Sequence, residues 1–112
     1  MFLKIHANRL SNKVKKQLLN EVDGVNEWDF TSYSLDKIQK RGIPVDNLSH
    51  TIAEGKLIEY HTKKDTRRVL LRDVDGTCAV VDLDKKAIIT AYKNNADYNH
   101  LNLDQSKYLF GA

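Results

Sequence analysis

The hydrophobic pattern of this chain changes its period at Lys56, and this change limits the folds that are open to it. Before Lys56, apolar residues recur about every fourth position, the spacing that places them on one face of a helix. After it come four segments rich in Val, Ile, Leu, Thr and Tyr, at 57–60, 68–72, 77–83 and 87–93. This composition is typical of strands. Short polar connections separate the segments, so we expect antiparallel neighbours.

Three helices are expected before the strands. Gly42 and Gly55 each follow a helical pattern and are expected to end it in the left-handed conformation. Residues 2–6 alternate weakly and fit either a short strand or the lead-in to the first helix. Capping residues give expected helix bounds of about 11–22 with Ser11 as N-cap, from Thr31 or Ser32 to Arg41, and from an Asp46 cap to Glu54.

This order of elements predicts an α+β domain in which two or three N-terminal helices pack on one face of an antiparallel four-stranded β-meander. At 112 residues, with 41% of them hydrophobic, the chain suffices for one core. We expect a single domain with a basic helical region at 1–22, a core at 30–93 and a polar tail at 94–112. The apolar end of that tail, residues 108–110, is expected to dock on the body or on a partner.

Composition also bears on location and cofactors. Cys78 is the only cysteine, which excludes an intrachain disulfide and suits a reducing compartment. No run of 18 apolar residues occurs, and the N-terminus lacks the apolar core of a signal peptide. We therefore expect a cytoplasmic protein without a membrane span. The histidines are scattered without the spacing of a zinc site, and we predict neither a metal nor a cofactor.

Residues 73–77 spell the DxDGT signature of haloacid dehalogenase-like phosphatases. That chemistry requires a parallel sheet, a distant Lys and further acids on later strands, which a chain of this size with a meander does not supply. Asp-Gly before an alternating strand is typical of a hairpin turn. We therefore predict a turn at this position.

Charge is distributed unevenly along the N-terminal part of the chain. The first acidic residue, Glu21, opens a block of acids with no base among them, which ends at Asp29. A cationic segment of this kind binds nucleic acid or an acidic protein surface, or it is a solvated helix face. The cations that precede Glu21 are Lys4, Arg9, Lys13, Lys15 and Lys16.

The second predicted helix carries cations and a phenol on one face. Leu35 and Ile38 are expected to face the core instead. Asp36 stands four residues before Lys40, so an ion pair within the helix explains part of the pattern. The residues that share the polar face are Tyr33, Lys37, Lys40 and Arg41.

The predicted strands add further candidates. Arg68 and Arg72 flank an apolar centre, and Tyr92 is expected on the same face as Ile88 because alternate strand residues share a face. Arginine stabilises the anionic pentacoordinate state of phosphodiester cleavage, and tyrosine transfers a proton or stacks on a base. His61, at a strand end beside several cations, is a candidate proton carrier. The simpler interpretation is a cross-strand tyrosine, solubilising arginines and an exposed histidine.

The order of these elements, with its Arg-Gly-Ile and Thr-Ala-Tyr landmarks, resembles the small bacterial and phage domains of the RelE/barnase/EndoU-type (BECR) ribonuclease fold. Such domains occur as stand-alone toxins, as toxin tips of contact-dependent systems and as mobile-element proteins. Family members often carry a His and an Arg where this chain has Tyr33 and Lys37. The resemblance covers roughly residues 30–93, and it rests on the segments 33–44, 52–60, 68–72 and 89–92.

The resemblance implies an RNA-binding, metal-independent endoribonuclease of the toxin type. In that case Arg68 and Arg72 would clamp phosphate, Tyr92 or Tyr33 would carry a proton or stack on a base, and His61 would assist proton transfer. The alternative is a non-catalytic phage- or mobile-element-encoded protein that binds nucleic acid or an acidic protein surface, with an antitoxin or a host protein as partner. The predicted nucleic-acid-binding residues are Lys13, Lys16, Lys37, Lys40, Arg41 and Lys93.

Overall fold

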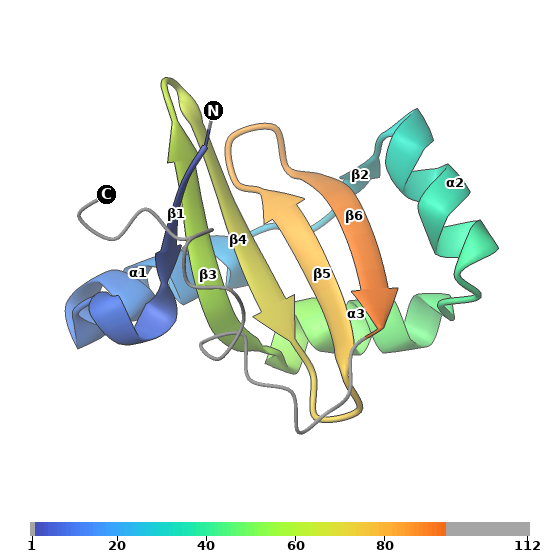
Figure 1. Ribbon diagram of the computed structural model, residues 1–112, viewed down its shortest axis with the longest axis horizontal. Coiled ribbons are helices and arrows are strands. Elements are labelled where there is room, and N and C mark those ends of the chain that lie inside the picture. The colour runs from blue at the N-terminus through green and yellow to red at the C-terminus, as the bar shows by residue number, and fades with distance from the viewer. Residues whose placement is uncertain (1, 94–112) are drawn as a thin grey trace.

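The computed structural model describes residues 2–93, and the predicted tail with its apolar end lies outside the described residues. The described part contains three α-helices, a 3₁₀ turn and a six-stranded, mostly antiparallel sheet, which confirms the α+β class (Figure 1). The elements are β1 (Leu3–His6), η1 (Ala7–Arg9), α1 (Asn12–Asp23), β2 (Asp29–Phe30), α2 (Ser32–Lys40), α3 (Val45–Glu54), β3 (Lys56–Lys63), β4 (Thr66–Arg72), β5 (Thr77–Asp82) and β6 (Ala87–Lys93).

The sheet has the strand order β1-β3-β4-β5-β6-β2. The strands β3 to β6 are antiparallel neighbours in chain order, as predicted, but the sheet has six strands and the prediction had four. β1 pairs antiparallel with β3, so Leu3–His6 form a strand and not a lead-in to the first helix, and β2 pairs parallel with β6. The two added strands are short edges, and β2 has only two residues, too few to produce a period in the sequence.

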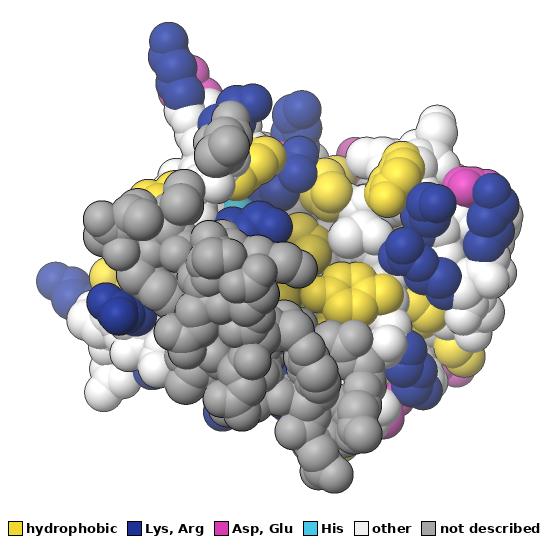
Figure 2. All heavy atoms as spheres, in the orientation of Figure 1, with side chains coloured by type: hydrophobic (Ala, Val, Ile, Leu, Met, Phe, Trp, Pro, Cys, Tyr) yellow, Lys and Arg dark blue, Asp and Glu magenta, His cyan; other side chains and the backbone are white. Residues whose placement is uncertain are grey.

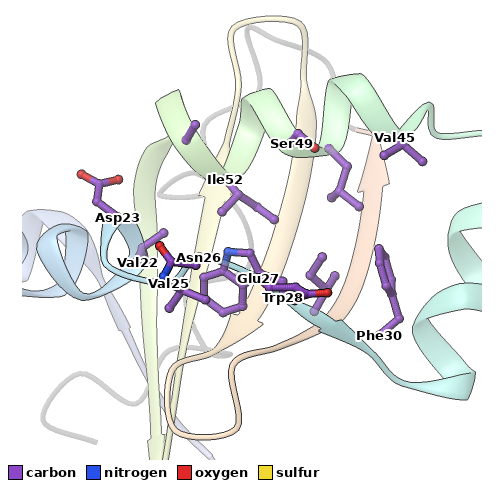
Figure 3. A pocket seen from close by; sticks show the side chains of 13 residues that line it. Val22, Asp23, Val25, Asn26, Glu27, Trp28, Phe30, Val45, Ser49 and Ile52 are labelled. Atoms are coloured by element: carbon purple, nitrogen blue, oxygen red, sulfur yellow. The ribbon is translucent and has the colours of Figure 1, made fainter.

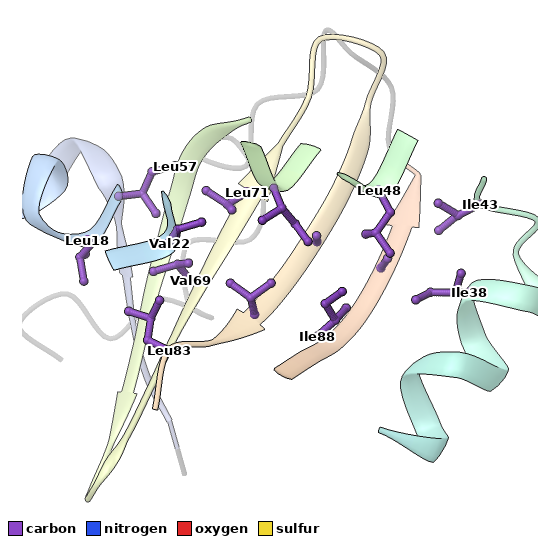
Figure 4. Close-up of a cluster of buried hydrophobic side chains, with 14 of the residues drawn as sticks. Leu18, Val22, Ile38, Ile43, Leu48, Leu57, Val69, Leu71, Leu83 and Ile88 are labelled. Carbon is purple, nitrogen blue, oxygen red and sulfur yellow. The ribbon is translucent and has the colours of Figure 1, made fainter. Parts of the chain in front are cut away.

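The helices pack against one side of the sheet. Figure 1 shows α1 and α3 behind the sheet, with α2 beside β6 at its edge. We call the opposite side, which the described helices leave uncovered, the helix-free face. The main core fills the space between the sheet and the helices (Figure 4), and its members include Leu18, Val22, Ile38, Leu48, Val69, Leu71, Val81 and Ile88.

Local capping signals set the first two helices. The Ser11 hydroxyl accepts the backbone N–H of Val14 at 3.2 Å, as predicted for an N-cap. Thr31 and Ser34 form a reciprocal capping box at the start of α2. Gly42 follows α2 with a φ of +64°, the left-handed conformation expected there. Over residues 2–93, no helix combines the length and the apolar character needed to cross a bilayer.

The third helix differs from the prediction at both ends. It begins at Val45 after Pro44, without a side-chain cap, and Asp46 lies inside its first turn. A carboxylate in that turn stabilises the helix through the macrodipole instead of through a cap bond. Gly55 is extended, with a φ of −67°, so the predicted left-handed ending is wrong. A Cβ at Gly55 would lie 2.2 Å from the carbonyl oxygen of Thr51, and this close approach is what requires glycine.

The turn between β3 and β4 is shorter than the sequence predicts, whereas the turn between β4 and β5 is as predicted. The predicted segments 57–60 and 68–72 are too short, because β3 and β4 continue to a two-residue turn at Lys64 and Asp65. Asp65, the second residue of this turn, takes a φ of +60°, a left-handed conformation that Asp tolerates better than most residues. The predicted turn before β5 is present, with Gly76 at a φ of +90°. The DxDGT residues therefore belong to a hairpin connection.

Two predicted facings are wrong. Ile88 belongs to the core on the helix side, whereas Tyr92 packs against the cluster on the helix-free face. The pairing of β5 with β6 shifts register between Val80 and Val81, and such a bulge moves the residues on either side of it to different faces. On α2, Ile38 is buried as expected, but Leu35 is 45% exposed.

Candidate nucleic-acid interface

Four of the five predicted catalytic residues lie on the helix-free face. Arg68 and Arg72 project from β4 to the same side as Leu70, because alternate strand residues share a face. Leu70 belongs to a second buried cluster, against which Tyr92 packs. His61 stands directly opposite Arg68 in the β3–β4 register. Figure 2 shows this face, with Lys and Arg side chains around an apolar area where described atoms are visible.

The first group of side chains is a polar cluster at the β3–β4 end of the face. Glu59 and His61 are both buried, and the His61 Nε2 lies 2.7 Å from the Glu59 Oε1. The Arg68 Nε lies 3.6 Å from the Asp82 Oδ2, and the guanidinium carbon lies 4.5 Å from the centre of the Phe2 ring. We call Glu59, His61, Arg68 and Asp82 the polar cluster. It places a histidine–carboxylate pair beside an arginine.

Asp82 gives Arg68 a structural role as well. Its side chain is completely buried, and its Oδ1 accepts the backbone N–H groups of Asp84 and Lys85 at 2.9 Å each. These bonds fix the β5–β6 turn. A buried carboxylate is costly unless a cation compensates it, and Arg68 is the cation beside it. Removal of Arg68 would therefore lower stability in addition to any effect on a ligand.

The second group lies at the other end of the face. Arg72, Cys78 and Tyr92 are register neighbours across β4, β5 and β6, and we call them the tyrosine row. Arg41, just beyond α2, reaches this row: one guanidinium nitrogen donates to the Ala91 carbonyl at 2.8 Å and to the Thr90 hydroxyl at 3.2 Å. The helix C-cap and the last strand are thereby joined beside Tyr92.

Burial governs the ionisation of this row. Burial is the main cause that raises the pKa of Tyr92, and the nearby charges of Arg41 and Arg72 oppose it only in part. Burial likewise raises the pKa of the Cys78 thiol to about 11. Both groups therefore keep their protons at neutral pH. Tyr92 is suited to donate a hydrogen bond or to stack on a base, and Cys78 is not a nucleophile.

The strand register places the polar cluster and the tyrosine row at different positions on the sheet. Arg68 and Arg72 are separated by four positions along β4, or roughly 13 Å of backbone, which favours contact with two different phosphates. His61 and Tyr92 lie on β3 and β6, with two strands between them. Opposed acid–base action of these two side chains on a single phosphate does not fit this separation. The face instead offers two sites along one strand direction.

A pocket of about 880 Å³ extends the tyrosine row toward α1. Arg72 lines it together with His6, whose imidazole is buried, and Asp23 is the one acid among its described lining residues. The pocket brings Lys16, a predicted nucleic-acid-binding residue, to the same site as Arg72. Its lysines are Lys15, Lys16 and Lys56.

The remaining predicted residues lie farther out. The Lys37 ammonium is 5.4 Å from the centre of the Tyr33 ring, and Lys40 pairs with Asp36 at 3.1 Å, as the sequence indicated. Tyr33 stands at the start of α2 and is exposed. It is eight positions from Arg41, or roughly 12 Å along the helix.

Two cations mark the margins of the candidate interface. Lys13 is exposed on α1. The Lys93 Nζ lies 3.8 Å from the Asp75 Oδ2 at the end of β6. Neither is in a described contact with the polar cluster or the tyrosine row.

Sequence reasoning missed the acids of the site. Glu59 is two residues before His61 in a strand, so the period of two alone places both on one face. Asp82 has a weaker signal, because an acid at the end of a Val-rich segment also fits a turn. Within residues 2–93, no group of three or more His, Cys, Asp or Glu side chains is arranged to hold a metal ion.

No protein-family model matches this chain, and no curated protein or solved structure matches it at a significant level. The resemblance to BECR ribonucleases therefore stays a prediction that rests on the residues quoted above.

Proposed function

We propose that this protein binds single-stranded RNA across the helix-free face of its sheet, as a ribonuclease-like domain that needs no metal. The observation that carries the proposal is the arrangement on β4, where Arg68 and Arg72 project to one face with Leu70 between them and Tyr92 in the Arg72 row. Cations that track the backbone and aromatic rings that accept stacked bases are the two features of single-strand binding.

The spacing of the cations favours an extended strand as the ligand. Arg68 and Arg72 would contact different phosphates, since roughly 13 Å of strand separates them. The lysines of the pocket beside Arg72 would continue the path toward α1. A strand laid along this line passes Tyr92, whose retained proton suits hydrogen-bond donation to a phosphate or base.

In this proposal the polar cluster carries out the cleavage. Metal-free cleavage of RNA needs a base that removes the 2′-hydroxyl proton, so that this oxygen attacks the adjacent phosphorus while the bond to the 5′-oxygen breaks and that oxygen takes a proton from water. His61 would take the proton, and Glu59 would orient its ring through the 2.7 Å bond to Nε2. Arg68, opposite His61 in register, would stabilise the anionic pentacoordinate state.

A second candidate function is binding without catalysis. The burial of the proposed base favours it: His61 and Glu59 are 8% and 5% exposed, so a 2′-hydroxyl reaches His61 only if this face opens. The departure at Tyr33 and Lys37 from the family's His and Arg favours it too. In this case the same cations would engage RNA, or an acidic antitoxin or host protein.

Fluorescence anisotropy with a labelled single-stranded RNA tests the proposal. Wild-type protein should bind, and the logarithm of the affinity should fall linearly with the logarithm of the salt concentration. The same RNA is then incubated with the protein in EDTA and resolved on a gel. Cleavage that is lost in His61→Gln, with binding retained, supports the ribonuclease. Binding without cleavage selects the second candidate, and no binding at low salt rejects both RNA-based functions.

A further inference from the structure

A separate groove lies on the helix side of the sheet, between α3 and the segment that leads from α1 into β2. It has a volume of about 410 Å³. Figure 3 shows Val45 and Ile52 of α3 on one wall, opposite Trp28 and Phe30 on the other. Val45 is 65% exposed and Phe30 is 40% exposed. The groove thus presents large apolar side chains to solvent from two elements at once.

The segments that form the two walls contain acidic residues but no Lys or Arg. Asp23 and Glu27 belong to the lining itself. Residues 21–30 and 45–54 together hold six of the chain's 15 acidic residues and none of its 18 lysines and arginines, although the chain has a net charge of +3. Glu21 is neutralised by Arg67, at 2.9 Å. The groove is therefore a local negative surface on a basic protein.

We infer that this groove docks a basic amphipathic segment of a partner protein. Exposed apolar residues from two walls provide the contact that an apolar peptide face seeks in a groove. The acids around them complement Lys or Arg side chains that flank such a face, and they disfavour an acidic segment or a nucleic acid. The groove lies on the other side of the sheet from the polar cluster and the tyrosine row, and it shares only Asp23 with the pocket beside Arg72, so the inference does not depend on RNA binding.

Trp28 makes the inference directly testable, because it is the only tryptophan in the chain and it lines the groove. The probe is a short Leu-Lys peptide of helical period that contains no aromatic residue. Titration should change the Trp28 emission in a saturable way. A peptide of the same pattern with Ser in place of every Leu should produce no such change, because it keeps the charge and lacks the apolar face.

Two matched variants locate the site. Val45→Lys places a cation in the groove and should weaken peptide binding at least tenfold. Val74→Lys makes the same change in the β4–β5 turn, where Val74 is 87% exposed and outside the groove lining, and should leave binding unchanged. Both positions are exposed, so both variants should fold, which circular dichroism checks.

Several outcomes would overturn the inference. Unchanged Trp28 emission, equal binding by the Ser peptide, or equal binding by Val45→Lys would each remove the groove as a site for a basic apolar segment. Self-association of the wild-type protein that Val45→Lys abolishes would assign the groove to a second copy of the chain. None of these measurements involves RNA, so their failure is distinct from failure of the proposed function.

Discussion

The two sides of β4 differ in chemistry although their residues alternate along one strand. Arg68 and Arg72 project to the helix-free face. Arg67, between Thr66 and Arg68, instead binds Glu21 of α1 and Asp84 of the β5–β6 turn, at 2.9 Å each. These bonds raise the pKa of the Arg67 guanidinium, with Glu21 as the largest cause. Adjacent arginines thus serve a candidate ligand surface and an internal ion-pair network.

This difference shows how a small domain can hold two opposite surfaces. A period of two sends neighbouring side chains to opposite sides of the sheet, so one strand can support both. The helix-free face gains Arg68 and Arg72 of β4 and Arg41 at the end of α2. The helix side gains the acids of the 21–30 segment and of α3. A partner for one surface is thereby electrostatically unsuited to the other.

The largest expected effect is a loss of stability from a substitution at Gly55, where a wall of the groove joins the sheet. Gly55 joins α3, a wall of the groove, to β3. A Cβ there would lie 2.2 Å from the Thr51 carbonyl oxygen and 3.3 Å from the Leu71 Cβ. Gly55→Ala should therefore lower the free energy of unfolding by about 3 kcal/mol. Urea denaturation measures this change.

Gly24→Ala is the matched control for this junction. Its Cβ would come no closer than 3.4 Å, to the Asn20 carbonyl oxygen, so the cost should be small. Equal stability of the two variants would mean that α3 shifts easily against the sheet. The position of α3, and with it the groove wall, would then be less rigidly fixed to the sheet than the close approach at Gly55 indicates.

The next effect separates the two sides of β4. Arg72→Gln should weaken RNA binding about tenfold, which corresponds to about 1.4 kcal/mol, and should lower the salt slope by about one unit. Arg67→Gln should leave RNA binding unchanged and lower the free energy of unfolding by about 1 kcal/mol, since its ion pairs are partly exposed. Anisotropy and urea denaturation of both variants provide the measurements.

The contrast between the two sides of β4 would be contradicted if the effects of these two variants on RNA binding and stability were exchanged. If Arg67→Gln impaired RNA binding as strongly as Arg72→Gln, the RNA would contact the helix side. The helix-free face would then no longer be the proposed RNA-binding surface. The negative charge of the groove walls would also no longer explain why RNA avoids the helix side.

The elements that sequence predicted correctly are those with local causes. Ser11, Thr31 and Gly42 act through bonds and backbone angles within one turn, so residue type is enough to identify them. The fate of Ile88 depends on a bulge between two strands, and the need for glycine at Gly55 depends on a contact with the preceding helix turn. Periodicity contains neither piece of information.

In the candidate site, too, the sequence reveals features with local causes and does not reveal those that depend on tertiary contacts. The sequence identified Arg68 and Arg72 as flanking an apolar centre, and both lie on one face of β4 because four positions separate them. The arrangement of α2 against β6, which brings Arg41 to the tyrosine row, is tertiary and left no mark in the sequence. The groove was missed because Trp28 and Phe30 lie in a segment without a period, where β2 has only two residues.

A smaller effect concerns pH and the groove wall. His50 of α3 pairs with the buried Asp73 of the β4–β5 turn, and this hydrogen bond is the main cause that raises the pKa of His50, with Asp73, Glu54 and Asp75 charges adding to it. The stabilisation is complete below the ordinary histidine pKa of about 6.5 and is lost as pH rises through the raised value.

Thermal unfolding of wild type and His50→Gln on both sides of this window checks the prediction. The wild type should lose stability as the pH increases, and His50→Gln should lose less. Parallel curves for the two proteins would show that this pair does not hold α3 against the turn. The groove wall would then depend on core packing alone.

The smallest effects distinguish the two tyrosines that sequence proposed for the same role. Tyr33 is 57% exposed and its ring lies 5.4 Å from the Lys37 ammonium, a contact that phenylalanine preserves. Tyr33→Phe should therefore change RNA affinity less than twofold. Tyr92→Phe removes a hydroxyl beside Arg41 and Arg72 and should weaken binding about threefold, which anisotropy resolves. A larger loss of affinity in Tyr33→Phe than in Tyr92→Phe would place the RNA across α2. The exposed face of that helix, and not the helix-free face, would then be the binding surface.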